Sequence, residues 1–130
     1  MLPQVSLPTE HFFLDGVYVR VMHCATGTIV VGKQHKREHI FIVAAGAIAI
    51  SDGSGPAKVC RAGEVFEAPP GVKRAALALE DSVCINVHRT DKTDLDEIEA
   101  ELLEYDPTAL LDARNQVKPE ALEMEKWPGE

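Results

Sequence analysis

Hydrophobic and polar residues alternate over short stretches through the first ninety positions of the chain. Alternation over roughly four to eight residues is typical of a strand with one buried face, whereas a helix repeats about every 3.6 residues. Turn-forming pairs such as Asp15-Gly16 and Thr26-Gly27 separate the stretches. The candidate strands are 11–14, 17–24, 28–32, 39–43, 46–51, 57–60, 64–67, 74–79 and 83–88. This pattern predicts an all-β sandwich or barrel over residues 1–90.

The period changes after this region, and the residues that follow predict a helix that extends to residue 104. Thr93 or Asp94 can cap its first turn, and Glu97 completes a capping-box pattern with Asp94. Its apolar stripe consists of Leu95, Ile98, Leu102 and Leu103. Acidic residues cover the opposite side, so one face of this helix is predicted to pack against the rest of the protein.

Residues 91–130 are therefore expected to form an acidic helical tail. A turn near 107–113 and a further short helix from Pro119 are consistent with the sequence. The tail is expected to pack on the outside of the sandwich or across the interface of a homodimer. On the outside it would cover the leucine–valine face of the last two predicted strands, which consists of Leu77, Leu79, Val83, Ile85 and Val87.

Two blocks of the chain carry most of the candidate chemistry. In the first, Gly32 to Gly46, His35 and His39 come directly before an apolar run that ends on glycine. In the second, Gly63 to Arg74, a Pro-x-Gly signal marks a turn after a short strand. These are strand–turn units with polar side chains at their ends.

The two blocks resemble the two sequence motifs of the cupin superfamily, over roughly residues 27 to 89. The resemblance implies a double-stranded β-helix, the cupin jelly roll. Its four usual metal-ligand positions fall on Lys33, His35, His39 and Arg74. Two positions therefore keep a side chain that can bind a metal, and two carry cations instead.

A longer pattern is similar to small cupin-like proteins found in tailed bacteriophage genomes. It comprises Lys33 to Ile40, Pro69 to Arg74, His88, and Thr93 to Glu99. That group has no settled activity, so this resemblance bears on fold and context more than on function. It implies a host cytoplasm as the location if the protein is phage-encoded.

Strand geometry predicts which side chains meet. Lys33, His35 and His39 share parity, so an extended strand points them to one face. In the last two strands, apolar faces match if Leu79 lies opposite Val83 across a three-residue loop.

That register places Arg74 opposite His88 and residue 76 opposite Asn86, on the side that would face the histidines. A two-residue loop would instead turn His88 to the other face.

His35, His39 and His88 are therefore the candidate metal ligands. Three neutral imidazoles suit Zn, Fe, Mn or Ni as divalent ions, and the sequence does not choose among these metals. The predicted ligand-binding residues are Lys33, Arg74 and Asn86. In the alternative without metal, the cations and histidines hold a carboxylate or phosphate through charge-assisted hydrogen bonds.

Composition and charge narrow the function further. The net charge is −8, and the acidic tail argues against a nucleic-acid partner or a membrane surface. The stretch Met1-Leu-Pro-Gln lacks the basic residues typical of a signal peptide, and no apolar run has the length expected of a membrane span. Cys24, Cys60 and Cys84 are scattered and read as reduced thiols, which predicts a cytoplasmic protein.

These observations predict a protein that binds a small anionic molecule, with or without a metal, as a sensor, sequestering or accessory module. The alternative is a metal-dependent cupin enzyme of the oxygenase or isomerase type that acts on a small anionic substrate. We also expect a homodimer.

Overall fold

The computed structural model describes residues 7–104 and 113–114 of the chain. The strands are β1 (Thr9–Leu14), β2 (Val17–Cys24), β3 (Ile29–Val31), β4 (His39–Ala45), β5 (Ala47–Ser51), β6 (Lys58–Arg61), β7 (Val65–Ala68), β8 (Ala75–Ala78) and β9 (Ser82–Arg89), and the helix is α1 (Leu95–Leu102). Each predicted strand is present, with ends shifted by no more than two residues.

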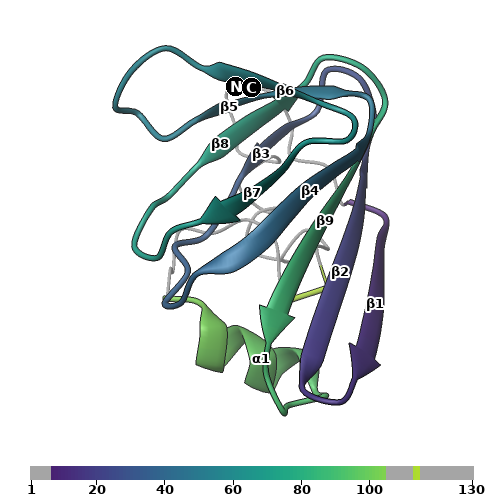
Figure 1. Ribbon diagram of the computed structural model, residues 1–130, viewed down its shortest axis with the longest axis vertical. Coiled ribbons are helices and arrows are strands. Elements are labelled where there is room, and N and C mark those ends of the chain that lie inside the picture. The colour runs from purple at the N-terminus through teal and green to yellow at the C-terminus, as the bar shows by residue number, and fades with distance from the viewer. Residues whose placement is uncertain (1–6, 105–112, 115–130) are drawn as a thin grey trace, which may run out of the picture.

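The strands form two antiparallel sheets that face each other (Figure 1). One has five strands in the order β1-β2-β9-β4-β7, and the other has four in the order β3-β8-β5-β6. The predicted all-β sandwich is thereby confirmed. A buried core lies between the sheets and consists of Leu7, Cys24, Val43, Ile48, Cys60, Ala78 and Cys84.

The predicted hairpin between the last two strands is wrong. β8 pairs with β3 and β5, whereas β9 pairs with β2 and β4 in the other sheet, so Leu79 does not lie opposite Val83. Matching apolar faces favour a hairpin, but the same match arises when two strands face each other across the interior. The inward sides were predicted correctly, because Arg74, Asn86 and His88 all line the interior.

Gly46, between β4 and β5, allows the chain to pass from one sheet to the other. Its φ is 79°, and a Cβ atom there would lie 2.4 Å from the carbonyl oxygen of Asp81 and from Oγ of Ser82. Only glycine fits both the left-handed backbone and this contact.

Helix α1 begins as predicted, with the Asp94 carboxylate accepting a hydrogen bond of 3.1 Å from the amide of Glu97. It lies across one end of the sandwich, below β9 and β2 in Figure 1. Ile98 and Leu102 pack there against Tyr18. The helix does not cover the leucine–valine face expected to need it, since Leu77 and Leu79 are 37% and 42% exposed.

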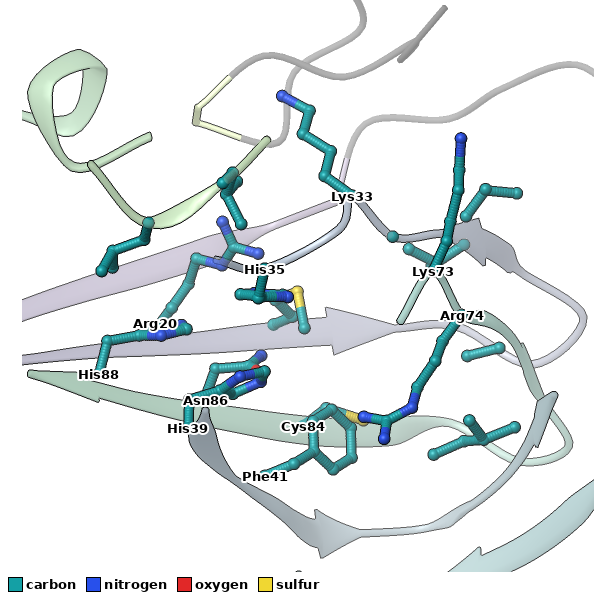
Figure 2. A pocket seen from close by; sticks show the side chains of 18 of the residues that line it. Arg20, Lys33, His35, His39, Phe41, Lys73, Arg74, Cys84, Asn86 and His88 are labelled. Atoms are coloured by element: carbon teal, nitrogen blue, oxygen red, sulfur yellow. The ribbon is translucent and has the colours of Figure 1, made fainter. Parts of the chain in front are cut away.

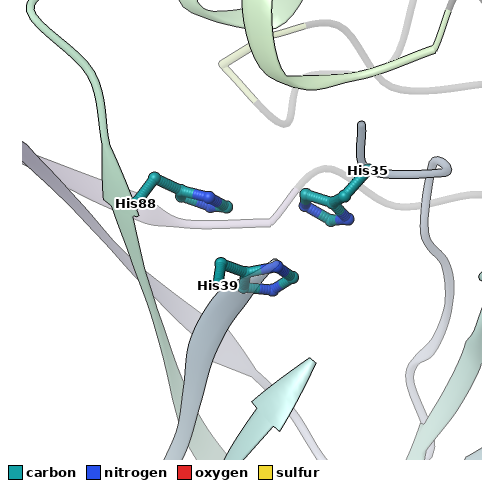
Figure 3. Close-up of side chains that lie close together, drawn as sticks. All are labelled: His35, His39 and His88. Atoms are coloured by element: carbon teal, nitrogen blue, oxygen red, sulfur yellow. The ribbon is translucent and has the colours of Figure 1, made fainter. Parts of the chain in front are cut away.

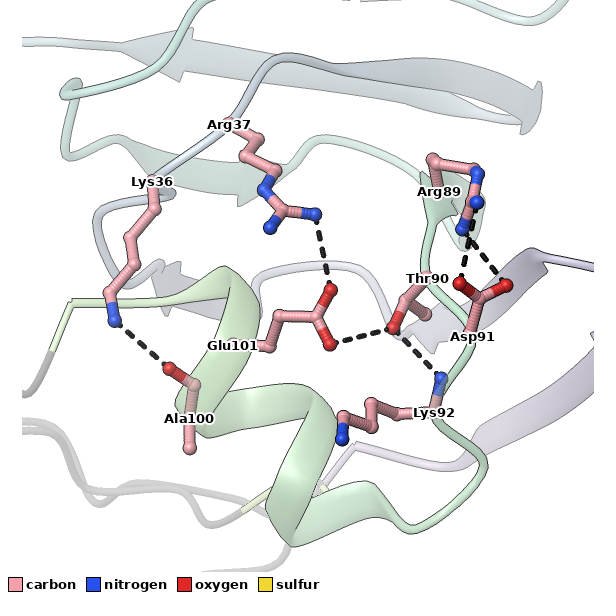
Figure 4. A network of polar contacts seen from close by, with 8 residues as sticks. All are labelled: Lys36, Arg37, Arg89, Thr90, Asp91, Lys92, Ala100 and Glu101. Carbon is pink, nitrogen blue, oxygen red and sulfur yellow. Dashed lines mark hydrogen bonds and ion pairs between the residues drawn. The ribbon is translucent and has the colours of Figure 1, made fainter.

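Polar contacts fasten α1 to the residues before β4 and after β9 (Figure 4). Lys36 donates to the carbonyl of Ala100 at 2.9 Å, and Arg37 pairs with Glu101 at 3.1 Å. The other carboxylate oxygen of Glu101 accepts from Thr90 at 3.1 Å. The helix is thus held by polar and ionic contacts as well as by the apolar contacts of Ile98 and Leu102.

The outward face of the five-stranded sheet carries a row of apolar side chains. Phe12 lies opposite Val19, Val19 opposite Val87, and Val87 opposite Ile40, which makes one apolar row across four strands. Phe12 is 51% exposed. No helix among the residues that the structure describes is long and apolar enough to cross a membrane.

The predicted helix from Pro119 and most of the predicted turn at 107–113 lie outside the described residues.

Candidate metal centre and ligand cavity

A cavity of about 320 Å³ lies between the two sheets and extends to α1. Much of its wall is apolar, and the sheets contribute Met22, Val30, Phe41, Ile48, Ile50 and Phe66. Ala76 and Ala78 of β8 also face inward, and their small side chains leave the space that larger residues would fill.

Three histidines converge at the end of the cavity near α1 (Figure 3). His35 lies in the segment before β4, His39 begins β4, and His88 is near the end of β9. Ring centroids are 4.1 Å apart for His35 and His39, and 4.6 Å apart for His39 and His88. One ring nitrogen from each lies within 4.8 Å of the others, so the cluster could hold a metal ion.

Burial keeps these imidazoles neutral. It is the main reason why the pKa of His35 falls from its ordinary value of 6.5 to about 3, and the nearby His39 and Arg20 lower that pKa further. Burial also lowers the pKa values of His88 and His39. Neutral imidazole is the form that coordinates a metal.

Asn86 fixes the orientation of the His39 ring. Oδ1 of Asn86 lies 3.0 Å from Nε2 of His39, so this ring nitrogen donates the hydrogen bond. The lone pair is then on Nδ1, which is buried and has no hydrogen-bond partner within residues 7–104 and 113–114. An orphaned buried acceptor beside two other neutral imidazoles is the donor set that a divalent transition metal would satisfy.

Two arginines reach the same cavity. Arg74 extends from the start of β8 toward Phe41 and Cys84 (Figure 2), and no hydrogen bond or ion pair engages its guanidinium within the described part of the chain. Arg20 of β2 lies beside His35 and His88, and its Nε is buried without a hydrogen-bond partner in the part of the chain that the structure describes. Positive charge therefore adjoins the three histidines.

Arg20 was not among the residues predicted for the site. A signal for it exists, because Arg20 shares parity with Tyr18, Met22 and Cys24, and all four line the cavity. An arginine at an inward position of a strand otherwise flanked by apolar residues points to an internal charge.

Lys33 lines the cavity as predicted, but it forms an ion pair with Glu99 of α1. The two side chains are 13% and 27% exposed. A partly buried lysine that already has a carboxylate partner is less available to an external anion than Arg74 is.

Tyr18 forms the wall of the histidine cluster on the side of β2. Its ring stacks on His88 at a centroid distance of 5.9 Å, and its hydroxyl lies 2.7 Å from Nδ1 of His11. Burial raises the pKa of Tyr18. Tyr18 therefore connects His11, near the protein surface, to His88 at the edge of the cluster.

Cys84 is buried in the core, and its thiol interacts with that of Cys24. Glu38 is exposed, and Arg37 beside it pairs with Glu101 of the helix.

No protein-family model matches the chain, and no curated protein sequence matches it either. Solved structures do. KdgF from a Halomonas species is 19% identical, with a TM-score of 0.57 over 68% of this chain and 83% of that one. A Klebsiella pneumoniae protein with a double-stranded β-helix domain is 18% identical, with a TM-score of 0.57 over 68% and 81%. A cupin superfamily protein from Desulfitobacterium hafniense is 12% identical, with a TM-score of 0.58 over 70% and 84%.

These neighbours are bacterial proteins, and they give no support to the resemblance to bacteriophage proteins. At such low identity they establish architecture and not activity. The two facing antiparallel sheets, the strand order and these matches agree on one fold. The chain has the double-stranded β-helix fold of the cupins.

Proposed function

We propose that the protein binds a small anionic molecule in its cavity, next to a divalent transition metal ion held by His35, His39 and His88. One observation carries this proposal. A single cavity contains three neutral imidazoles and the Arg74 guanidinium, which has no anionic partner among the described residues. The role would be that of a sensor, a sequestering protein or an accessory module.

The metal part of the proposal is supported by the free Nδ1 of His39. A buried nitrogen acceptor without a partner is costly unless something donates to it or coordinates it. Zn, Fe, Mn and Ni ions all accept three imidazole ligands, so the donor set fits each of them. Asn86 would then act through His39, by holding its ring.

The anion part is supported by charge. Arg74 and Arg20 place two cations beside histidines that stay uncharged. The Arg74 guanidinium has no anionic partner among the described residues, and in a mainly apolar cavity it favours a carboxylate or phosphate. Lys33 would contribute its field at the edge, since Glu99 already holds its ammonium group.

The second candidate is a metal-dependent enzyme acting on a small anionic substrate. It is favoured by the number of protein ligands, because three imidazoles leave coordination positions open. When bound, the metal would polarise a substrate or activate water. The chain's own residues would bind and orient the anion through Arg74 and exclude water through the apolar wall.

Metal analysis tests the first part. Full-length protein purified without an affinity tag should contain about one transition metal ion per chain, and His35→Ala should lose it. His23→Ala is the matched control, because His23 is exposed on β2 and pairs with Glu10. Two results would rule out the proposed centre. One is a His35→Ala variant that retains the metal, and the other is a wild-type protein that is purified without metal and binds none when metal is added.

Calorimetry with inorganic phosphate and with formate tests the second part. Arg74→Gln should weaken binding of an anion that the wild type takes up, whereas Arg61→Gln, on the exposed side of β6, should not. If the wild type bound none of phosphate, formate, benzoate and hexanoate, anion binding would be contradicted.

A further inference from the structure

The cavity is amphipathic to a degree that binding a small inorganic anion does not require. At one end are the histidines and Arg20. Most of the remaining wall comes from aliphatic and aromatic side chains, among them Met22, Phe41 and Phe66. Figure 2 shows Arg74 reaching down beside Phe41, away from Lys33 and Lys73, which extend toward the opposite side.

Placing a guanidinium among such side chains has a direct consequence for what can pair with it. A hydrated phosphate would lose water on every side but would find donors on only one, which is unfavourable. A carboxylate attached to an apolar body keeps its charge at Arg74 and presents carbon to the rest of the wall.

We propose that the ligand is a small monocarboxylate with an aliphatic or aromatic body, whose carboxylate meets Arg74 and whose body packs against the surrounding apolar wall, which includes Phe41 and Phe66. This inference rests on the proposed binding of an anion and specifies its class. Lys33 does not call for a second carboxylate, because Glu99 already pairs with it.

The volume of the cavity sets the size. At about 30 Å³ per water molecule, 320 Å³ corresponds to about ten waters, which leaves room for a small molecule such as benzoate or hexanoate. This volume is at the lower end of the range for small-molecule sites. Benzoate and hexanoate are suitable probes, because each joins one carboxylate to an apolar body of this order.

Isothermal titration calorimetry on metal-loaded, full-length protein tests the proposal. Benzoate or hexanoate should bind at least about tenfold more tightly than benzamide, which lacks the charge, and than inorganic phosphate, which lacks the apolar body. Arg74→Gln should weaken carboxylate binding by about tenfold or more, with Arg61→Gln unchanged. Phe66→Leu, which keeps the core apolar, should weaken binding of benzoate but not of phosphate.

Three results would overturn the inference, and they separate it from the proposed function. Phosphate binding as tightly as benzoate, with loss in Arg74→Gln, would keep the anion site and refute the apolar body. Benzamide binding as tightly as benzoate would refute the carboxylate. If none of the anions binds, the proposed function itself fails. Circular dichroism of each variant shows that it is folded, and Arg74→Lys, which keeps the charge, should retain part of the affinity.

Discussion

The histidine cluster should make the metal-free protein unstable in mild acid. His35 has a pKa of about 3 in the folded chain and an ordinary value of 6.5 when exposed, and burial lowers the pKa of His88 as well. Below pH 6.5 the unfolded chain therefore binds protons that the folded chain refuses. Stability is complete above that pH and falls as the pH decreases toward the folded-state pKa.

The magnitude follows from this displacement. One unit of pKa corresponds to about 1.4 kcal/mol, so lowering the pH from about 7.5 to about 5 removes on the order of 2 kcal/mol for each such histidine. His35 and His88 together give about 4 kcal/mol, which is a large part of the 5–15 kcal/mol typical of domains. Exposed carboxylates contribute little in this interval, because they remain ionised.

Urea unfolding at the two pH values, with chelator present, measures the effect. The free energy of unfolding should drop at the lower pH, and His35→Gln should reduce that drop by about 2 kcal/mol because glutamine does not titrate. Equal stability of the wild type at both pH values would show that the cluster is as easily protonated in the folded chain as in the unfolded one, and would refute the reasoning.

Three further outcomes are expected. Gly46→Ala should destabilise the fold by at least about 2 kcal/mol more than Gly71→Ala, since both glycines have a φ of 79° but only Gly46 would push a Cβ against backbone; equal losses in chemical denaturation would contradict this. Glu99→Gln should cost about 1–2 kcal/mol in the same assay, because it removes the charge of the carboxylate from a partly buried ion pair. An unchanged midpoint would show that the pair contributes nothing. We also propose a homodimer through the apolar row on the outward face of the five-stranded sheet, so Val87→Lys should yield monomers in sedimentation velocity. A wild type that is already monomeric at micromolar concentration would refute it.

Patterns among residues close together in the sequence were sufficient to predict most of the strands and the start of the helix. Period-two alternation and glycine turns located the strands, and Asp94 with Glu97 located the start of the helix. Parity along the chain predicted that His35 and His39 share one face. The prediction for His88 depended on the register of a hairpin that the structure does not contain, although His88 does join the cluster.

The remaining features depend on contacts between distant parts of the chain. The pairing of β8 could not be predicted, because matching apolar faces do not distinguish two strands in one sheet from two strands facing across the interior. Lys33 and Glu99 are sixty-six positions apart, and no local pattern connects them. Arg20 shares inward parity with its apolar neighbours on the strand, but it lies outside the two blocks, Gly32 to Gly46 and Gly63 to Arg74, from which the site was predicted.

The ionic attachment of α1 has a consequence for the rate at which molecules enter and leave the cavity. The helix forms part of the cavity wall, so a ligand that leaves on this side must displace contacts such as Arg37–Glu101 and Lys33–Glu99. Arg37 is 57% exposed, and dissolved salt screens its pair strongly, whereas the more buried Lys33 pair is screened much less. Raising the ionic strength should therefore speed ligand exchange only up to a limit. Beyond that limit, the Lys33–Glu99 pair alone sets the residence time of the ligand.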